Sequence, residues 1–250
     1  MGLLRLFLPG FAQKGGFTLD TESVVSLPLP ARHPMSYVKK CIWPKEFMAE
    51  LLGSDFVMYW CSSTCFLGTF VMVIIAKSAA VSLAVLSARS DSAASGSLLT
   101  NGLSAGLGVM VGILVTGNAS GAHMNPCVSV AMAVWGRLKF SALPSYIFGQ
   151  FLGAAAGSAL VLFIFYDTIV EVGPEAMTSY PGLAESEVQL SFDQGVATFI
   201  LLLVVCSVED QGHTPPALLV GLTVATITIT MGANSGASMN PAVDFMPRYP

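Results

Sequence analysis

Charged side chains are scarce in this sequence: Asp, Glu, Lys and Arg make up 10% of the 250 residues, while 54% are hydrophobic. A soluble domain carries about 25% charged residues, so this chain has too few to cover a folded core with a polar surface. The mean hydropathy of +0.71 points the same way. The composition therefore predicts a membrane protein, and the length suits one bundle of spanning helices embedded in a lipid bilayer.

Clusters of basic residues and catalytic motifs are also missing. The net charge is −4 and Lys39-Lys40 is the longest basic run, so the chain lacks the positive surface that nucleic acid requires. The five cysteines are odd in number and lie mostly in apolar runs, which argues against a disulfide framework or a metal site. No Ser/His/Asp set, His-Glu-x-x-His motif or pair of carboxylates at a useful spacing is present. We expect no enzyme activity, no cofactor and no bound metal.

Residues 1–44 contain no run long enough to span a membrane. Their short apolar stretch at 3–11 is interrupted by Pro9, and no small-residue cleavage pattern follows it, as a signal peptide would need. We therefore expect residues 1–44 to form a loose N-terminal tail, followed by one membrane domain at residues 45–250.

Five apolar stretches can supply membrane spans, each of which needs about 20 residues. They lie at residues 98–116, 142–166, 190–208 and 217–231, and within 47–88. The sequence therefore predicts an all-α, multi-pass membrane protein.

The charges between these stretches predict how the chain is oriented. Basic residues precede the first stretch, and Arg137 and Lys139 lie between the second and the third, whereas residues 167–193 contain acids and no Lys or Arg. Because basic loops stay on the cytoplasmic side, the N-terminus is expected in the cytoplasm.

The first apolar stretch is too long for one span, because residues 47–88 would form a helix of about 60 Å. A span at 66–86 places Lys77 near the middle of the bilayer, which is costly unless the ammonium finds a partner or a wet cavity. A span at 51–76 buries Asp55 instead. Residues 51–65 resemble an insertion, and the sequence leaves both alternatives open.

A short repeat is the strongest signal in the chain. Residues 120–128 and 235–243 share seven of nine identities, and each copy contains Asn-Pro. Three spans separate the copies, so the second enters the membrane from the opposite face, as in the inverted repeats of many transport proteins. The repeat predicts two loops that dip into the membrane from opposite sides.

Each copy carries the start signals of a helix. Asn is a favoured N-cap and Pro a favoured first helical residue, so short half-helices are expected to begin after Asn125 and Asn240. Their N-termini, each with about half a positive charge, would disfavour cations near the membrane midplane. The side-chain amides of both asparagines would offer hydrogen-bond donors to a passing solute.

The backbone of the loops supplies the matching acceptors. Irregular backbone at this depth is tolerated only beside protein or a water-filled cavity. We therefore expect pore-facing carbonyls in both loops, at Gly121, Ala122, His123 and Gly236. Neutral hydroxylic solutes could exchange their hydrogen bonds with water for hydrogen bonds with the pore, which predicts a passive channel for small uncharged molecules.

A gated secondary transporter is the alternative within transport, because such proteins also place half-helices at the midplane. A transporter needs coupling carboxylates in its spans, and none lies beside either Asn-Pro motif. Facilitated diffusion is therefore favoured.

At these residues the chain resembles the aquaporins, or major intrinsic proteins, and within them the aquaglyceroporin branch. The resemblance rests on the paired Asn-Pro loops, on Asp244 after the second motif, on Gly-Arg-Leu at 136–138 and on Phe-Asp-Gln at 192–194, and it covers about residues 46–248. It implies an inverted repeat of six spans with two half-helices and a homotetramer with one pore per subunit. It also implies water and glycerol as permeants.

The resemblance assigns roles to individual residues. The pore motif corresponds to Asn125, Pro126, Cys127, Asn240, Pro241 and Ala242, and the narrow selectivity filter to Ala105, Thr228, Ala237 and Val243. Val243 stands where the family has Arg, and neither Ala105 nor Ala237 is aromatic. The filter is therefore expected to be wider and less polar than is usual in the family.

Further residues are expected to support the loops. Gln194 and Glu50 resemble positions where the family buries an acid that holds the loop backbone, although the apparent insertion shifts Glu50 out of register. Asp244 is grouped with them. His123 is interpreted as a hydrogen-bonding loop residue rather than a metal ligand, because no partner lies at ligand spacing.

The repeat is incomplete at its second copy, since eight residues follow Ala242 whereas a whole span follows Cys127 in the first copy. The expected fold therefore shows five full spans with the sixth missing, in a C-terminally truncated channel domain. A non-conducting or structural member of the family is the alternative hypothesis.

Overall fold

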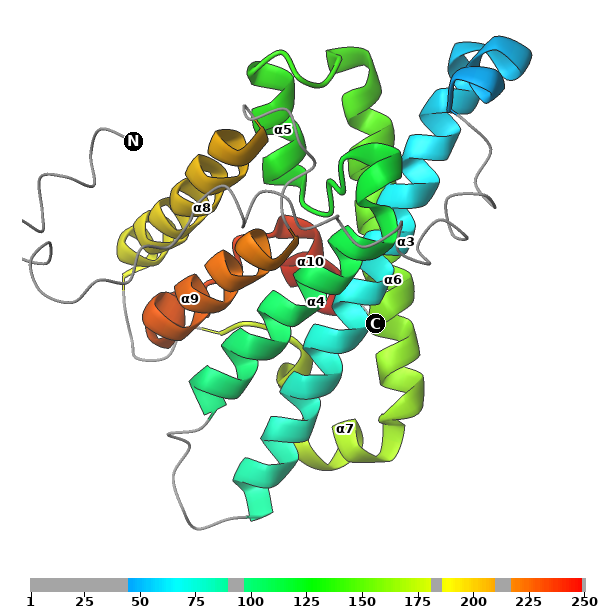
Figure 1. Ribbon diagram of the computed structural model, residues 1–250. Helices are drawn as coiled ribbons and strands as arrows, with labels where there is room; N and C mark the ends of the chain where they lie inside the picture. Colours follow the sequence, from blue (N-terminus) through cyan, green and yellow to red (C-terminus); the bar gives the residue numbers. More distant parts are fainter. Residues whose placement is uncertain (1–44, 90–96, 181–185, 210–216, 249–250) are drawn as a thin grey trace, which may run out of the picture. The chain divides into compact units, whose positions relative to one another are not determined.

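The computed structural model describes residues 45–89, 97–180, 186–209 and 217–248, apart from the side chains of residues 45–61, 97, 118–120 and 209 (Figure 1). The tail expected at residues 1–44 lies outside these residues, and so does the side chain of Glu50.

All regular structure in the described ranges is helical, and no strand is found among them. The long helices are α3 (Lys45–Arg89), α4 (Ser97–Ser120), α6 (Leu143–Ile164), α8 (Glu187–Glu209) and α9 (Ala217–Ser235). The short α-helices are α5 (Pro126–Val134), α7 (Tyr166–Val172) and α10 (Pro241–Phe245), and the 3-10 turns are η1 (Phe140–Ala142), η2 (Pro174–Met177) and η3 (Met246–Arg248). The all-α prediction is confirmed.

Five helical segments in this part of the chain are long and apolar enough to cross a membrane, as the sequence predicts. They are Ser62–Arg89, Leu98–Gly117, Phe140–Ile164, Glu187–Val208 and Ala217–Ser235. The first contains Lys77, whose side chain is 8% exposed. The alternative span at 51–76 begins among residues whose side chains lie outside the described part of the chain. The apparent insertion at 51–65 continues the same helix, because α3 is unbroken from Lys45 to Arg89.

Small residues allow the long helices to approach closely. Helix α3 packs against both α4 and α6, and α4 packs against α9 (Figure 1). A Cβ atom on Gly106 of α4 would lie 2.3 Å from the carbonyl oxygen of Gly221 in α9, and one on Gly153 of α6 would lie 2.4 Å from that of Phe66 in α3. Such contacts replace the hydrophobic driving force, which is weak between helices in lipid.

Large apolar side chains cover the outside of the bundle. Phe163 is 82% exposed, Val188 78% and Phe192 74%, and many leucines of the spans are also exposed. In water this much exposed apolar surface would cause aggregation, whereas in a bilayer it contacts acyl chains. The burial pattern therefore matches a membrane-embedded bundle.

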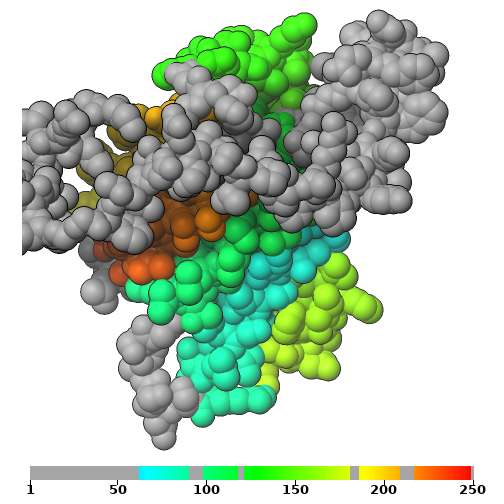
Figure 2. Space-filling view, in the orientation of Figure 1, coloured from blue at the N-terminus to red at the C-terminus, as the bar shows by residue number. Residues whose placement is uncertain are grey.

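Two apolar clusters organise the interior. The larger one joins the spans to the two half-helices α5 and α10. The smaller one consists of Val81, Val161, Ile169 and Met177, which join α3, α6, α7 and η2. Figure 2 shows α7 and the adjoining end of α6 beside the C-terminal half of α3. This cluster fixes the segment after α6 against the C-terminal half of α3.

Candidate functional site

Both Asn-Pro loops contain backbone in the left-handed region. The φ angle is 75° at Gly121 and 56° at Ala122 in the first loop, and 78° at Gly236, 43° at Ala237 and 49° at Met239 in the second. Glycine tolerates this region, but each non-glycine residue there costs about 1–3 kcal/mol. Such strain persists only where surrounding contacts hold the backbone, so both loops require hydrogen bonds from neighbouring side chains.

Each loop ends at an asparagine that caps a half-helix. The Asn125 Oδ1 atom accepts a hydrogen bond from the Cys127 amide at 2.9 Å, and α5 follows with Pro126 as its first residue. The Asn240 Oδ1 atom accepts from the Ala242 amide at 3.2 Å at the start of α10. The predicted half-helices and their caps are therefore confirmed.

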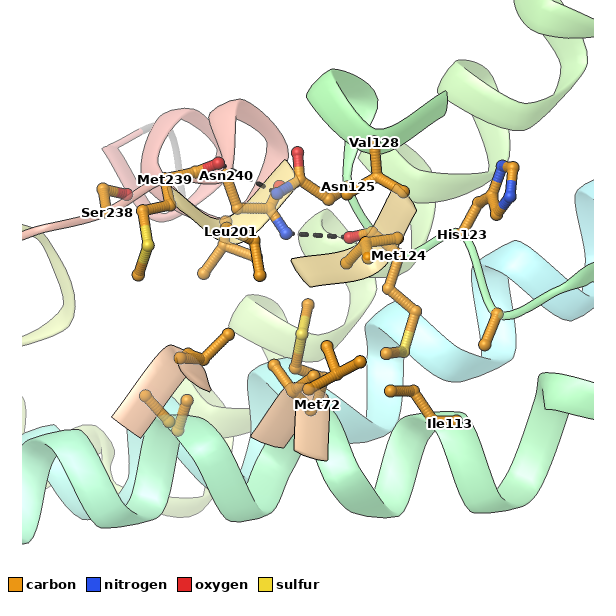
Figure 3. A pocket seen from close by; sticks show the side chains of 18 of the residues that line it. Met72, Ile113, His123, Met124, Asn125, Val128, Leu201, Ser238, Met239 and Asn240 are labelled. Carbon is orange, nitrogen blue, oxygen red and sulfur yellow. Dashed lines mark hydrogen bonds between the residues drawn. The ribbon is translucent and has the colours of Figure 1, made fainter. Parts of the chain in front are cut away.

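The two asparagines also reach across to the opposite loop. The Asn125 Nδ2 atom donates to the Met239 carbonyl at 2.9 Å, and the Asn240 Nδ2 atom donates to the Met124 carbonyl at 2.8 Å (Figure 3). Both side chains are buried, at 7% and 9% exposure. An amide nitrogen carries two hydrogens, so each asparagine keeps a second N–H donor after this exchange.

A cavity of about 110 Å³ lies at the meeting point of the loops. About 10–15 Å³ of such volume is enough for one water molecule, so several fit. Figure 3 shows the asparagine amides on one side and apolar side chains, including Met72 and Ile113, on the other. The wall is formed by Met72, Ala76, Ala105, Val109, Ile113, Gly121, Ala122, His123, Met124, Asn125, Val128, Leu201, Val205, Val220, Val224, Ser238, Met239, Asn240 and Val243.

The structure brings some of the expected filter and carbonyl residues to this wall and not others. Ala105 and Val243 line the cavity, and so do Gly121, Ala122 and His123. Three expected residues, Thr228, Ala237 and Gly236, are not on the cavity wall. The side chains of Thr228 and Ala237 are buried, at 4% and 3% exposure.

Gln194 of α8 supports the second loop. Its Nε2 atom donates to the Ser235 carbonyl at 2.9 Å, and its Oε1 atom accepts from the Met239 amide at 3.2 Å. The Ser235 hydroxyl in turn donates to the Asp193 carboxylate. One side chain therefore holds both ends of the strained segment. Asp244, grouped with the support residues, instead accepts from Arg248 at 3.2 Å.

Gln150 of α6 supports the first loop, a role that was not predicted from the sequence. Its Nε2 atom donates to the His123 carbonyl at 2.6 Å and to the Ser129 hydroxyl at 2.8 Å, and its side chain is fully buried. A signal was available, because an amide inside the apolar run of α6 is expensive in a membrane and marks a functional position. The carbonyl of His123, expected to face solute, already accepts this bond.

The imidazole of His123 is enclosed by protein. Its Nδ1 atom lies 3.5 Å from the Ser129 hydroxyl, and its ring packs edge-on against Tyr146 at 5.2 Å between centroids. Burial lowers the pKa of His123 to about 4, so the ring is neutral at physiological pH. Among the described residues no group of three or more His, Cys, Asp or Glu side chains could hold a metal ion.

Comparisons with known proteins agree with this geometry. Residues 60–249 match the sequence profile of a family described as major intrinsic protein. The chain belongs to the major intrinsic protein family. This family member is 37% identical over 202 residues to Aquaporin-9 of Homo sapiens, covering 73% of the chain and 66% of that relative. It is also 32% identical over 200 residues to Aquaglyceroporin-2 of Rhizophagus irregularis, covering 73% of the chain and 62% of that protein.

A solved structure supports the same assignment. The X-ray structure of the aquaglyceroporin from Plasmodium falciparum superposes with a TM-score of 0.70 at 30% identity, covering 77% of this chain and 80% of that one. The expected family, its aquaglyceroporin-like branch and its fold are confirmed, and the chain is a multi-pass membrane protein. It spans about two thirds of the length of the curated relatives named above.

Proposed function

We propose that this chain forms a passive transmembrane channel for water and small uncharged solutes such as glycerol. The observation that carries the proposal is the exchange between Asn125 and Asn240 beside the cavity. Each amide is held in place by one hydrogen bond to the opposite loop, which leaves one N–H for a solute oxygen.

The lining suits a molecule that is polar on one side and apolar on the other. A hydroxyl group moved into hydrocarbon without a partner costs roughly 4–8 kcal/mol, which limits its passage through lipid. Here hydroxyls can bond to the asparagine amides, while the carbon backbone lies against Met72, Val109 and Leu201. The names of the related aquaglyceroporins support glycerol as a permeant.

The same lining opposes ions. No Asp, Glu, Lys or Arg is among the residues that form the cavity wall, and burial keeps His123 neutral by lowering its pKa to about 4. A desolvated ion would therefore meet no compensating charge, and its desolvation penalty amounts to several kcal/mol. Because no carboxylate lines the cavity, nothing there could couple solute movement to protons or sodium, so transport would be downhill.

The proposed selectivity filter consists of the four residues expected from the sequence. Ala105, Thr228, Ala237 and Val243 would form a constriction without an arginine or an aromatic ring, wider and less polar than the family pattern. Larger polyols and urea would then pass more readily than through a filter with the usual arginine. The presence of Ala105 and Val243 on the cavity wall supports this assignment.

The proposed channel also has an expected oligomeric state and an expected orientation in the membrane. The chain would form a homotetramer in a lipid bilayer with its N-terminus in the cytoplasm, in agreement with the basic residues near the first span. It would act without a cofactor and catalyse no chemical reaction.

Tracer flux separates a channel from a coupled transporter. Purified protein in liposomes should take up radiolabelled glycerol at a rate that rises linearly with concentration, and imposed proton or sodium gradients should not change it. Accumulation of glycerol above the external concentration when a gradient is imposed would contradict a passive channel.

A further inference from the structure

Arg248, at the end of η3, is exposed but contacts three other residues through its guanidinium group. Its Nη2 atom lies 3.2 Å from both carboxylate oxygens of Asp244, and its Nε atom donates to the Asp244 backbone carbonyl at 3.1 Å. The same Nη2 atom donates to the Ser179 carbonyl at 2.7 Å. Its guanidinium carbon lies 5.3 Å from the ring centroid of Tyr180. One side chain thus bridges the second half-helix and the segment after η2.

That segment lies directly on the second pore loop. A Cβ atom added to Gly236 would come within 2.8 Å of the Ser179 Cβ atom, so the Ser179 side chain leaves no room for a side chain at position 236. Gly236 also has a φ of 78°, which L-residues rarely adopt. Ser179 therefore packs on the second loop at Gly236, two residues before Ser238 on the cavity wall, and Arg248 holds the carbonyl of Ser179.

We propose that Arg248 is a positioning residue of the channel: anchored on Asp244, it holds the Ser179–Tyr180 segment against Gly236 and so sets the width of the entrance on the side of the second loop. Val243, one residue before Asp244, leaves that side of the pore without the arginine of the family pattern. Arg248 supplies a guanidinium from the same half-helix region, aimed at the covering segment and not at the cavity. The effect on the entrance rests on the proposed channel function, whereas the hold of Arg248 on the Ser179–Tyr180 segment does not.

The first test measures the covering segment itself. Amide hydrogen exchange of residues 174–180 is followed in the full chain for wild type and Arg248→Gln, with Arg89→Gln as the matched control. Arg89 is a second arginine on this side of the bundle, but it makes an exposed 3.6 Å pair with Glu171. Arg248→Gln should give roughly tenfold faster exchange, the factor expected from losing one charge-assisted hydrogen bond. Arg89→Gln should leave this segment unchanged.

A second variant keeps the guanidinium and weakens its anchor. Asp244→Asn should also accelerate exchange of residues 174–180, by a smaller factor than Arg248→Gln, because the backbone carbonyl of residue 244 still accepts from Arg248. Unchanged exchange in both variants would overturn the proposal, and so would equal acceleration in Arg89→Gln.

Solute permeability distinguishes a specific effect on the entrance from general destabilisation of the fold. In liposomes, Arg248→Gln should raise the permeability to xylitol, a longer polyol, more than that to glycerol, because a looser segment widens the entrance. An equal loss for both solutes would mean general unfolding and would overturn the positioning role. If wild type conducts neither solute, the channel proposal fails, while the exchange experiment still decides whether Arg248 holds the segment.

Discussion

The side-chain amide of Asn240 donates to the backbone carbonyl of Met124, 116 residues earlier in the chain, at 2.8 Å. Asn125 makes the equivalent bond to the carbonyl of Met239. Each asparagine therefore caps its own half-helix with its side-chain oxygen and holds the opposite loop with its side-chain nitrogen. Neither loop can move without breaking a buried hydrogen bond of the other, which costs about 1–3 kcal/mol. The two halves of the repeat therefore stabilise one another at the cavity.

Gln194 is predicted to stabilise the second loop through both ends of its amide. Gln194→Leu removes the bonds to Ser235 and Met239, and should lower the free energy of unfolding by roughly 2–4 kcal/mol because buried backbone groups lose their partners. The thermal unfolding midpoint in detergent, followed by tryptophan fluorescence, measures the effect.

Gln194→Glu is the informative partner of this variant, because it keeps the acceptor for the Met239 amide while replacing the donor to the Ser235 carbonyl with a carboxyl oxygen. Its midpoint should fall between those of wild type and Gln194→Leu. Gln189, exposed near the start of the same helix, provides the control substitution to Leu, which removes only the exposed capping bonds with Ser186 and should cost about 1 kcal/mol or less. If Gln189→Leu is as destabilising as Gln194→Leu, the support role is contradicted.

Gly106 and Gly195 are predicted to respond in opposite ways to alanine. A Cβ at Gly106 would press on the Gly221 carbonyl at 2.3 Å, so Gly106→Ala should separate α4 from α9 and destabilise by about 1–3 kcal/mol. Gly195, in α8, has nothing within 4 Å of such a Cβ, and alanine there should stabilise by about 0.5–1 kcal/mol. Unfolding midpoints of the two variants check this, and a shift of the same sign in both would refute the close packing of α4 on α9.

His123 is predicted to make stability depend on pH. Its pKa is about 4 in the folded chain, because of burial, and about 6.5 when unfolded. The neutral ring is fully compatible with folding above pH 6.5, and stability falls as the pH drops from 6.5 toward 4, since the unfolded chain binds the proton first. The loss at pH 5 should be roughly 2 kcal/mol.

The His123→Gln variant isolates this contribution, because all other titrating groups are unchanged. Unfolding midpoints at pH 7 and pH 5 should differ less in the variant than in wild type. Equal pH dependence in both proteins would mean that His123 is not buried as a neutral ring.

The fold could largely be predicted from sequence because the bilayer simplifies the problem. Long apolar runs must be helices, so the four later spans were located to within a few residues, and the repeat revealed the two half-helices. The first span was ambiguous, since hydropathy alone could not choose between burying Lys77 and burying Asp55. In the structure Lys77 is buried, and Val81, one turn further along α3, packs against Val161 of α6, so the bundle extends past Lys77.

The site was less accessible to prediction because its contacts join residues far apart in the chain. Sequence identified Asn125, Asn240 and Gln194, whose roles follow from repeated or motif positions. An amide within the apolar run of α6 marks Gln150 as unusual, but not its partner His123, 27 residues away in another element. Likewise, nothing in the sequence near Arg248 indicates its partner Ser179, 69 residues away. No local pattern encodes such pairs, and they require coordinates.

Val243 is predicted to control the size of the permeating solutes. Val243→Arg would place a long cationic side chain on the cavity wall and narrow it, so permeability to urea and larger polyols should fall by roughly tenfold or more and that to water much less. Stopped-flow light scattering of liposomes with a panel of solutes measures this. Unchanged uptake of glycerol, urea and larger polyols would mean that the filter lies elsewhere.

The measurement that bears most directly on channel function is the osmotic response of liposomes that contain the purified chain. Stopped-flow scattering should show water and glycerol permeabilities well above those of protein-free vesicles, and Asn240→Asp should reduce both because it removes the donor to Met124 and adds a charge at the cavity. Asn234→Asp, an exposed change near the end of α9, should leave them unchanged. Rates equal to those of protein-free vesicles for both solutes would contradict the channel and favour a non-conducting role.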